Sequence, residues 1–84
     1  MNRRRLLRRL LAGSRNVAFA DLLNLAEGFG FRLARMRGSH HILSHTDVPE
    51  LLNLQPRGSQ AKAYQIQQFL DLIEAYGLSL EDEG

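Results

Sequence analysis

The chain has 84 residues, and its hydrophobic and charged contents of 44% and 24% are ordinary for a folded globular protein. It contains no cysteine, which excludes disulfide bonds and thiolate zinc sites. No apolar run approaches the about 20 residues that span a bilayer, and Arg8 and Arg9 interrupt the leucine-rich start, so a signal-peptide core is missing. We therefore expect one small cytoplasmic domain that makes no membrane contact.

The net charge of +2 conceals a strong asymmetry along the chain. Residues 1–62 carry all eleven basic groups against four acidic ones, a local net charge of +7. Residues 63–84 carry five acidic groups and no basic one, a local net charge of −5. A basic body of this kind suits a polyanion such as RNA or an acidic protein partner. A solvated surface with charged helix ends explains the same pattern equally well, so charge alone leaves both interpretations open.

Two helices are predicted in the first thirty residues. Residues 1–13 place leucines at i, i+1, i+4 and i+5 opposite five arginines, which predicts a short basic helix that ends at Gly13. Its arginines either hold phosphate or face solvent. After a loop, Asn16 is expected to cap a second helix that ends at Gly30. Its core stripe has the spacing i, i+3, i+4 and i+7: Phe19, Leu22, Leu23 and Ala26.

Three strands and a final helix follow. Residues 31–37 and 40–45 alternate as two strands, and the glycine of Gly38–Ser39 suits a type II′ hairpin turn between them. Residues 50–56 predict a third strand. We expect Ser59 to cap the last helix and Gly77 to end it, with a buried stripe of Ile66, Phe69, Leu70 and Ile73.

The predicted order is α-α-β-β-β-α, which is the α+β class with a three-stranded antiparallel sheet packed on helices. The chain then divides into a basic helix over residues 1–13, a core over residues 17–78 and an acidic tail over residues 79–84 that is expected to fray.

All three histidines lie in the predicted hairpin. A Gly38–Ser39 turn pairs Arg37 with His40, Met36 with His41, Arg35 with Ile42 and Arg32 with His45, and directly opposed residues share a face. The face of Phe31, Leu33 and Ile42 carries the larger apolar groups, so we expect it to be the core face. This assignment leaves His41 and His45 on the open face, although a shift of one residue would reverse it.

The spacing of the histidines argues against a metal site. On a strand, His41 and His45 lie about 13 Å apart at about 3.3 Å per residue, and His40 and His41 point to opposite faces. Neither pair can share an ion whose ligands sit at about 2 Å. We therefore expect no metal.

A histidine beside this turn has the chemistry that RNA cleavage needs. Histidine exchanges a proton near neutral pH, and metal-free cleavage needs a base for the 2′-hydroxyl and an acid for the departing 5′-oxygen. Cations or amides must stabilise the charged phosphorane. A surface or packing histidine fits the same pattern, and the residues alone do not separate these interpretations.

The stretch "GFRLARMRGSHHILSH", followed by "LLNLQPRGSQAKAYQIQQFLDLIEAYGL", resembles the HicA toxins of bacterial toxin–antitoxin pairs. The resemblance covers about residues 17–80, and the Gly-Ser-His-His turn is its most specific part. It implies a fold like that of double-stranded-RNA-binding domains. It also implies an endoribonuclease that cleaves mRNA without a cofactor and is silenced by a HicB-like antitoxin. The basic helix of residues 1–13 is additional to the minimal domain of this family.

The resemblance implies the site residues as well. The last position of the family's Gly-Ser-x-His motif is the functional histidine, which is His41 here; Gly38, Ser39 and His40 would support it. We assign RNA contacts to Arg35, Arg37 and Lys62 from their positions beside the turn and at the start of the last helix. A protein of this kind is expected to be a monomer when free.

Two other functions compete with the ribonuclease. The first is a non-catalytic RNA-binding module, which would usually carry a lysine cluster at the start of the last helix, where this chain has Lys62 alone. The second is a protein-interaction domain whose basic surface binds an acidic partner. Loss of RNA integrity on expression separates the ribonuclease from both.

Overall fold

The computed structural model describes residues 2–81 and has the predicted order of elements. Three helices and three strands follow one another as α1 (Arg3–Leu11), α2 (Phe19–Gly28), β1 (Arg32–Arg37), β2 (His40–His45), β3 (Val48–Leu54) and α3 (Ala63–Ala75). The strands form one antiparallel sheet in the order β1-β2-β3. The prediction of an α+β protein with a three-stranded antiparallel sheet is therefore confirmed. No helix within residues 2–81 has the length and apolar character needed to cross a membrane.

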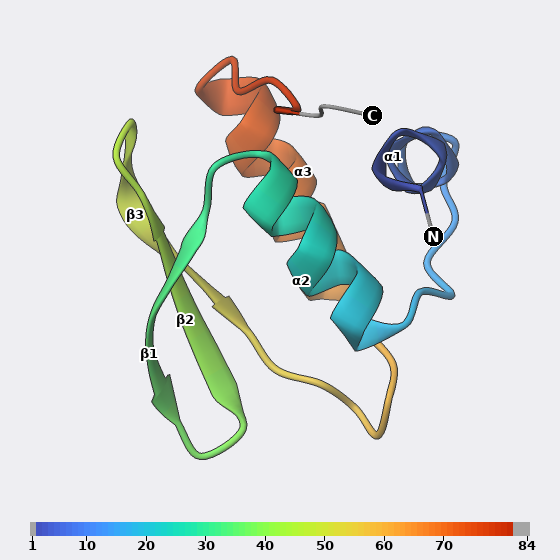
Figure 1. The fold of residues 1–84 in the computed structure, drawn as a ribbon. Coiled ribbons are helices and arrows are strands. Elements are labelled where there is room, and N and C mark those ends of the chain that lie inside the picture. The colour runs from blue at the N-terminus through green and yellow to red at the C-terminus, as the bar shows by residue number, and fades with distance from the viewer. Residues whose placement is uncertain (1, 82–84) are drawn as a thin grey trace.

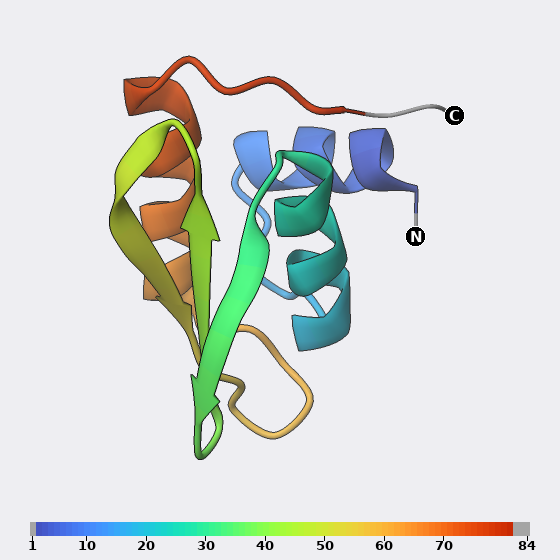
Figure 2. The same cartoon turned by 60° about the vertical axis from the view of Figure 1, so that its left-hand side comes forward.

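The helices lie on one face of the sheet and leave the other face open. Figures 1 and 2 show α2 and α3 behind the same side of the sheet, with α1 crossing at the end away from the β1–β2 turn. The largest fully buried side chains come from all three helices, from β2 and β3, and from the loop before β1: Leu10, Leu22, Leu25, Phe31, Leu43, Leu52, Leu54, Ile66 and Phe69. The core thus fills the space between the sheet and the helices, with α1 closing one end through Leu6 and Leu10.

The two side-chain caps expected from the sequence are wrong. Helix α2 begins after Ala18, not Asn16, and α3 begins after Lys62, not Ser59; neither has a side-chain cap. The segments before the two helices instead run side by side. The Phe19 N–H donates to the Ser59 carbonyl at 2.9 Å, and the Ala61 N–H donates to the Val17 carbonyl at 2.8 Å. These backbone bonds hold both segments extended, so the starts of α2 and α3 meet.

The register of the hairpin is the predicted one beside the turn and differs beyond it. Arg37 faces His40, Met36 faces His41 and Arg35 faces Ile42. A bulge between Leu33 and Arg35 then shifts the pairing, so Arg32 faces Ser44 and not His45. The extra residue in the bulge is Ala34, and an inserted residue of this kind reverses the alternation of every side chain that follows it.

The predicted core face is also wrong. Leu43, on the His41 side of β2, is buried in the core, whereas every residue of β1 is exposed, including Leu33 at 51%. Phe31 is fully buried, but it precedes β1 and packs from the α2–β1 loop. Phe31 and Leu33, from which the opposite core face was predicted, therefore do not form one buried face of β1. His41 and His45 point toward the helices, and β1 is a solvated edge.

The chain after α3 packs against the domain as far as Glu81. Leu78 and Leu80 are partly buried against the core, and the Glu81 N–H donates to the Gly28 carbonyl at the end of α2. The Tyr76 hydroxyl donates to the Glu50 carboxylate of β3, a bond that raises the pKa of Tyr76. The expectation of a frayed tail is wrong for residues 79–81, and residues 82–84 lie outside the described part of the chain.

Candidate functional site

The histidine turn lies at the end of the molecule where α2 and α3 begin. Figures 1 and 2 show the β1–β2 turn, the loop after β3 and the N-terminal end of α2 gathered at the end opposite α1. Gly38 has φ +59°, whereas no residue other than glycine has a positive φ in the described chain. Positive φ at the first central residue alone is what a type II′ turn requires, as predicted. His40 and His41 are therefore the first two residues of β2, directly after the turn.

His41 is held in one orientation by two contacts. Its Nδ1 lies 3.0 Å from the Ser39 carbonyl oxygen, and its ring meets the Phe19 ring edge-on with centroids 4.9 Å apart. A carbonyl oxygen only accepts hydrogen bonds, so Nδ1 carries the hydrogen. In the neutral ring the lone pair is therefore on Nε2. The turn itself thus selects the tautomer whose outer nitrogen is a base.

Among the described residues, the Nε2 atom of His41 has no hydrogen-bond partner and is not fully buried. Within residues 2–81, Nδ1 has the only hydrogen bond of the ring, and no buried side-chain nitrogen or oxygen lacks a partner. His41 as a whole is half-buried, with Phe19 covering one side. An oriented, unpaired and accessible imidazole nitrogen is the arrangement that proton transfer to or from a bound molecule requires.

A chain of hydrogen bonds joins the turn to the start of α3. Gln55 donates from Nε2 to the Ser39 hydroxyl at 2.9 Å and accepts at Oε1 from the Lys62 ammonium at 3.0 Å. Its own backbone N–H donates to the side-chain oxygen of Gln65, which is the one buried polar residue of the described chain. Lys62 is therefore tied to the residue that orients His41. Lys62, which was predicted from its place at the start of the last helix, is linked to the turn through Gln55.

Arg35, Arg37 and His40 lie on the other face of the sheet. Arg37 opposes His40 and Arg35 opposes Ile42, whereas His41 is opposed by Met36. His40 Nδ1 lies 3.1 Å from the side-chain oxygen of Asn53 on β3. The predicted site residues thus form two groups: His41, Ser39 and Lys62 toward the helices, and Arg35, Arg37 and His40 on the helix-free face.

His45 is a structural residue. Its Nε2 donates to the Phe29 carbonyl at 2.9 Å, and its Nδ1 accepts from the Asp47 N–H at 3.0 Å. The ring also packs edge-on against Phe31 with centroids 5.1 Å apart. Both nitrogens are used by the backbone, so His45 has no atom left for chemistry. It joins the far end of β2 to the end of α2.

Three residues of the site were not predicted from the sequence: Phe19, Gln55 and Gln65. Phe19 was expected only as a core residue, and its contact with His41 depends on how α2 meets the sheet. Gln55 directly follows β3, and Gln65 follows it by ten positions in α3. A buried glutamine in an otherwise apolar helix stripe, next to Ile66, is the one signal in the sequence that points to this network.

Within residues 2–81, no three histidine, aspartate or glutamate side chains gather closely enough to hold a metal ion. Comparison of the chain with protein-family models, with curated proteins and with solved structures finds no match.

Proposed function

We propose that this protein is the toxin of a type II toxin–antitoxin system, an endoribonuclease that cleaves mRNA without a metal and so arrests translation. The observation that carries the proposal is the unpaired, incompletely buried Nε2 of His41 within the described residues, which the Ser39 carbonyl makes the basic nitrogen of the ring. The resemblance of residues 17–80 to HicA toxins points to the same histidine. Charge supports an RNA substrate, because residues 1–62 have a net charge of +7.

The proposal includes a fold like that of double-stranded-RNA-binding domains. The order α2-β1-β2-β3-α3, with both helices on one face of the sheet, supports it. In this arrangement α1 is an addition at the end away from the histidine turn.

His41 begins the reaction as a general base. Nε2 takes the proton of a ribose 2′-hydroxyl, and the 2′-oxygen attacks the adjacent phosphorus. The P–O5′ bond breaks, which leaves a 2′,3′-cyclic phosphate on one fragment. The departing 5′-oxygen receives a proton and becomes a hydroxyl. That proton comes from water, because in-line attack places the 5′-oxygen opposite the 2′-oxygen across phosphorus, and the protonated His41 ring returns its own proton to solvent.

Lys62 supplies positive charge on the same side of the sheet. The phosphorane gains negative charge on its non-bridging oxygens, and a nearby ammonium stabilises it more than it stabilises the starting phosphate. Gln55 holds the Lys62 ammonium and the Ser39 hydroxyl at the same time. The cation and the base are therefore positioned by one amide.

The partner that the proposal implies is a HicB-like antitoxin that covers His41. In the absence of this antitoxin, the proposed toxin is a monomer. Blocking needs only a surface that seals the solvent side of Nε2, because the other sides of the ring already touch Phe19 and the turn.

The test is incubation of the purified protein with a long single-stranded transcript in the presence of a metal chelator. We expect fragments that end in 2′,3′-cyclic phosphate and begin with a 5′-hydroxyl, and growth arrest with loss of full-length mRNA when the protein is induced in bacteria. Intact RNA with folded protein would overturn the ribonuclease. A gel shift on the same transcript would then point to a non-catalytic RNA-binding module, and no shift to a protein-interaction domain.

Gln55→Ala should lower the rate of cleavage by about tenfold, because the variant releases both Ser39 and Lys62 and a misplaced catalytic group of this kind costs about 10–100-fold. The backbone bond from residue 55 to Gln65 does not need the side chain, so the unfolding temperature should change little. Cleavage rates and thermal unfolding of Gln55→Ala are compared with Gln68→Ala, an exposed glutamine elsewhere on α3. Equal rates for the two variants would show that the network has no role in catalysis.

A further inference from the structure

The helix-free face of the sheet has a shallow depression at the hairpin tip. Its lining residues come from all three strands: Arg37, His40, Ile42 and Asn53. The side chain of Ile42 forms an apolar floor and is only 7% exposed. Arg35 is the direct cross-strand neighbour of Ile42 and so belongs to the same face of the sheet. The helix side of the sheet and His41 do not contribute to it.

The groups around this depression suit a nucleotide. His40 donates from Nδ1 to the Asn53 oxygen, which orients its ring and leaves its Nε2 without a partner among the described residues and incompletely buried. The amide nitrogen of Asn53 remains available to the edge of a base. RNA-binding proteins read unstacked bases by stacking on histidine or arginine planes and by hydrogen bonds to the base edges, and arginine binds phosphate.

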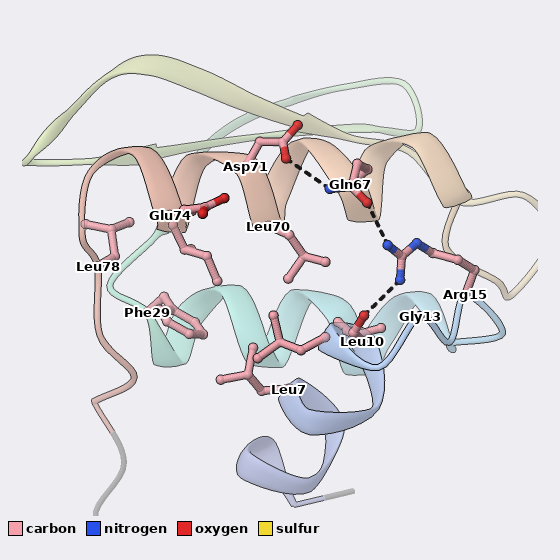
Figure 3. A pocket seen from close by; sticks show the side chains of 12 residues that line it. Leu7, Leu10, Gly13, Arg15, Phe29, Gln67, Leu70, Asp71, Glu74 and Leu78 are labelled. Carbon is pink, nitrogen blue, oxygen red and sulfur yellow. Dashed lines mark hydrogen bonds between the residues drawn. The ribbon is translucent and has the colours of Figure 1, made fainter.

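The absence of carboxylates sets this depression apart. Four other depressions on the surface of residues 2–81 each have acidic groups in their lining: Asp71 and Glu74, Glu27 and Glu81, Glu50 and Asp71, and Asp47 and Glu81. Figure 3 shows the first of these, between α1 and α3, with the carboxylates of Asp71 and Glu74 on its α3 side. A carboxylate repels a phosphate, whereas Arg37 attracts one. Of these five depressions, the one on the helix-free face is therefore the one whose lining has a guanidinium and no carboxylate, which suits an anionic ligand.

We propose that this depression binds one nucleotide of the single-stranded RNA whose neighbouring nucleotide reacts at His41. The inference rests on the proposed function and assigns the substrate strand a path around the hairpin tip. His40 and His41 are adjacent and face opposite sides of β2, so a strand that contacts both has to pass around the hairpin, and we place its path over the turn. Gly38 has no side chain, and apart from its two chain neighbours no heavy atom of the described residues lies within 4 Å of where its Cβ would be.

The test measures RNA binding in a His41→Ala background, where the substrate stays intact. Fluorescence anisotropy with a short, labelled single-stranded RNA gives the affinity of each variant as a function of salt. We expect His40→Ala and Asn53→Ala to weaken binding by about tenfold, the lower part of the range for loss of one stacked base. Arg37→Gln should also reduce the slope of log affinity against log salt by about 0.7, the value for one phosphate contact on a single strand.

Arg5→Gln is the matched control, because it removes the same charge from an exposed position on α1 at the opposite end of the molecule. It should leave affinity and salt slope nearly unchanged. Equal losses of RNA affinity in Arg37→Gln and Arg5→Gln would mean that positive charge attracts RNA over the whole surface. Unchanged affinity in His40→Ala and Asn53→Ala would mean that the depression holds no base. Either result overturns the inference. Neither result depends on cleavage. Failure of the ribonuclease proposal appears separately, as intact RNA with the unmodified protein.

Discussion

His41→Ala is expected to reduce RNA cleavage by about 10²–10⁴-fold, the usual contribution of a positioned general acid or base. The side chain makes one hydrogen bond, to the Ser39 carbonyl, and one ring contact, to Phe19. Ser39 is exposed, so water replaces the lost bond, and a bond of this kind contributes about 0.5–1.5 kcal/mol. The variant should therefore be folded and inactive, and induced cells should grow with intact mRNA.

His41→Asn separates catalysis from positioning. An asparagine side chain can donate to the Ser39 carbonyl as Nδ1 does, but its amide is no base at neutral pH. This variant should keep the turn and the wild-type unfolding temperature and yet be as inactive as His41→Ala. The measurements are initial rates on a labelled transcript and thermal unfolding, with Gln68→Ala as the folded control. Retained cleavage in His41→Asn would remove the catalytic role from the Nε2 lone pair.

The parts of the hairpin that the sequence predicts correctly are those that local chemistry determines. Gly38 is the residue that a type II′ turn needs at its first central position, and this turn sets the pairs Arg37–His40 and Met36–His41. The pairing fails only beyond Ala34, where the bulge adds a residue. Nothing in "RLARMR" marks Ala34 as the inserted position, because a bulge is selected by packing and twist across the whole sheet.

Which face of the sheet is buried, and so which face carries His41 toward the helices, depends on contacts between residues that are far apart along the chain. Alternation in residues 31–37 favours burying Phe31 with Leu33, yet Leu33 is exposed because the helices cover β2 and β3. Which strands are covered depends on the backbone bonds between the segments before α2 and α3. The same bonds bring Phe19 against His41. The turn that carries the histidines is thus predictable from the sequence, while the immediate surroundings of His41 require the tertiary structure.

Gly30→Ala is expected to destabilise the protein strongly. Gly30 has φ +98°, and a Cβ there would lie 2.7 Å from His45 Nε2. A strained backbone of this kind costs about 1–3 kcal/mol, and overpacking adds about 1–3 kcal/mol. The ring cannot simply move aside, because His45 bonds to the Phe29 carbonyl and the Asp47 N–H. Such a loss is a large fraction of the about 5–15 kcal/mol that stabilises a typical domain.

Gly13→Ala isolates the backbone part of this cost. Gly13 has φ +109°, but a Cβ at that position meets no atom within 4 Å. Urea unfolding should therefore show a smaller loss for Gly13→Ala than for Gly30→Ala, and the difference reports the contact with His45. In a His45→Ala background, which itself loses about 1–3 kcal/mol through unpaired backbone groups, the added cost of Gly30→Ala should fall to that of Gly13→Ala. If the cost is the same in both backgrounds, His45 does not anchor β2 to the end of α2. If the cost falls, His45 fixes the far end of β2, and this structural role is separate from the role proposed for His41 at the hairpin tip.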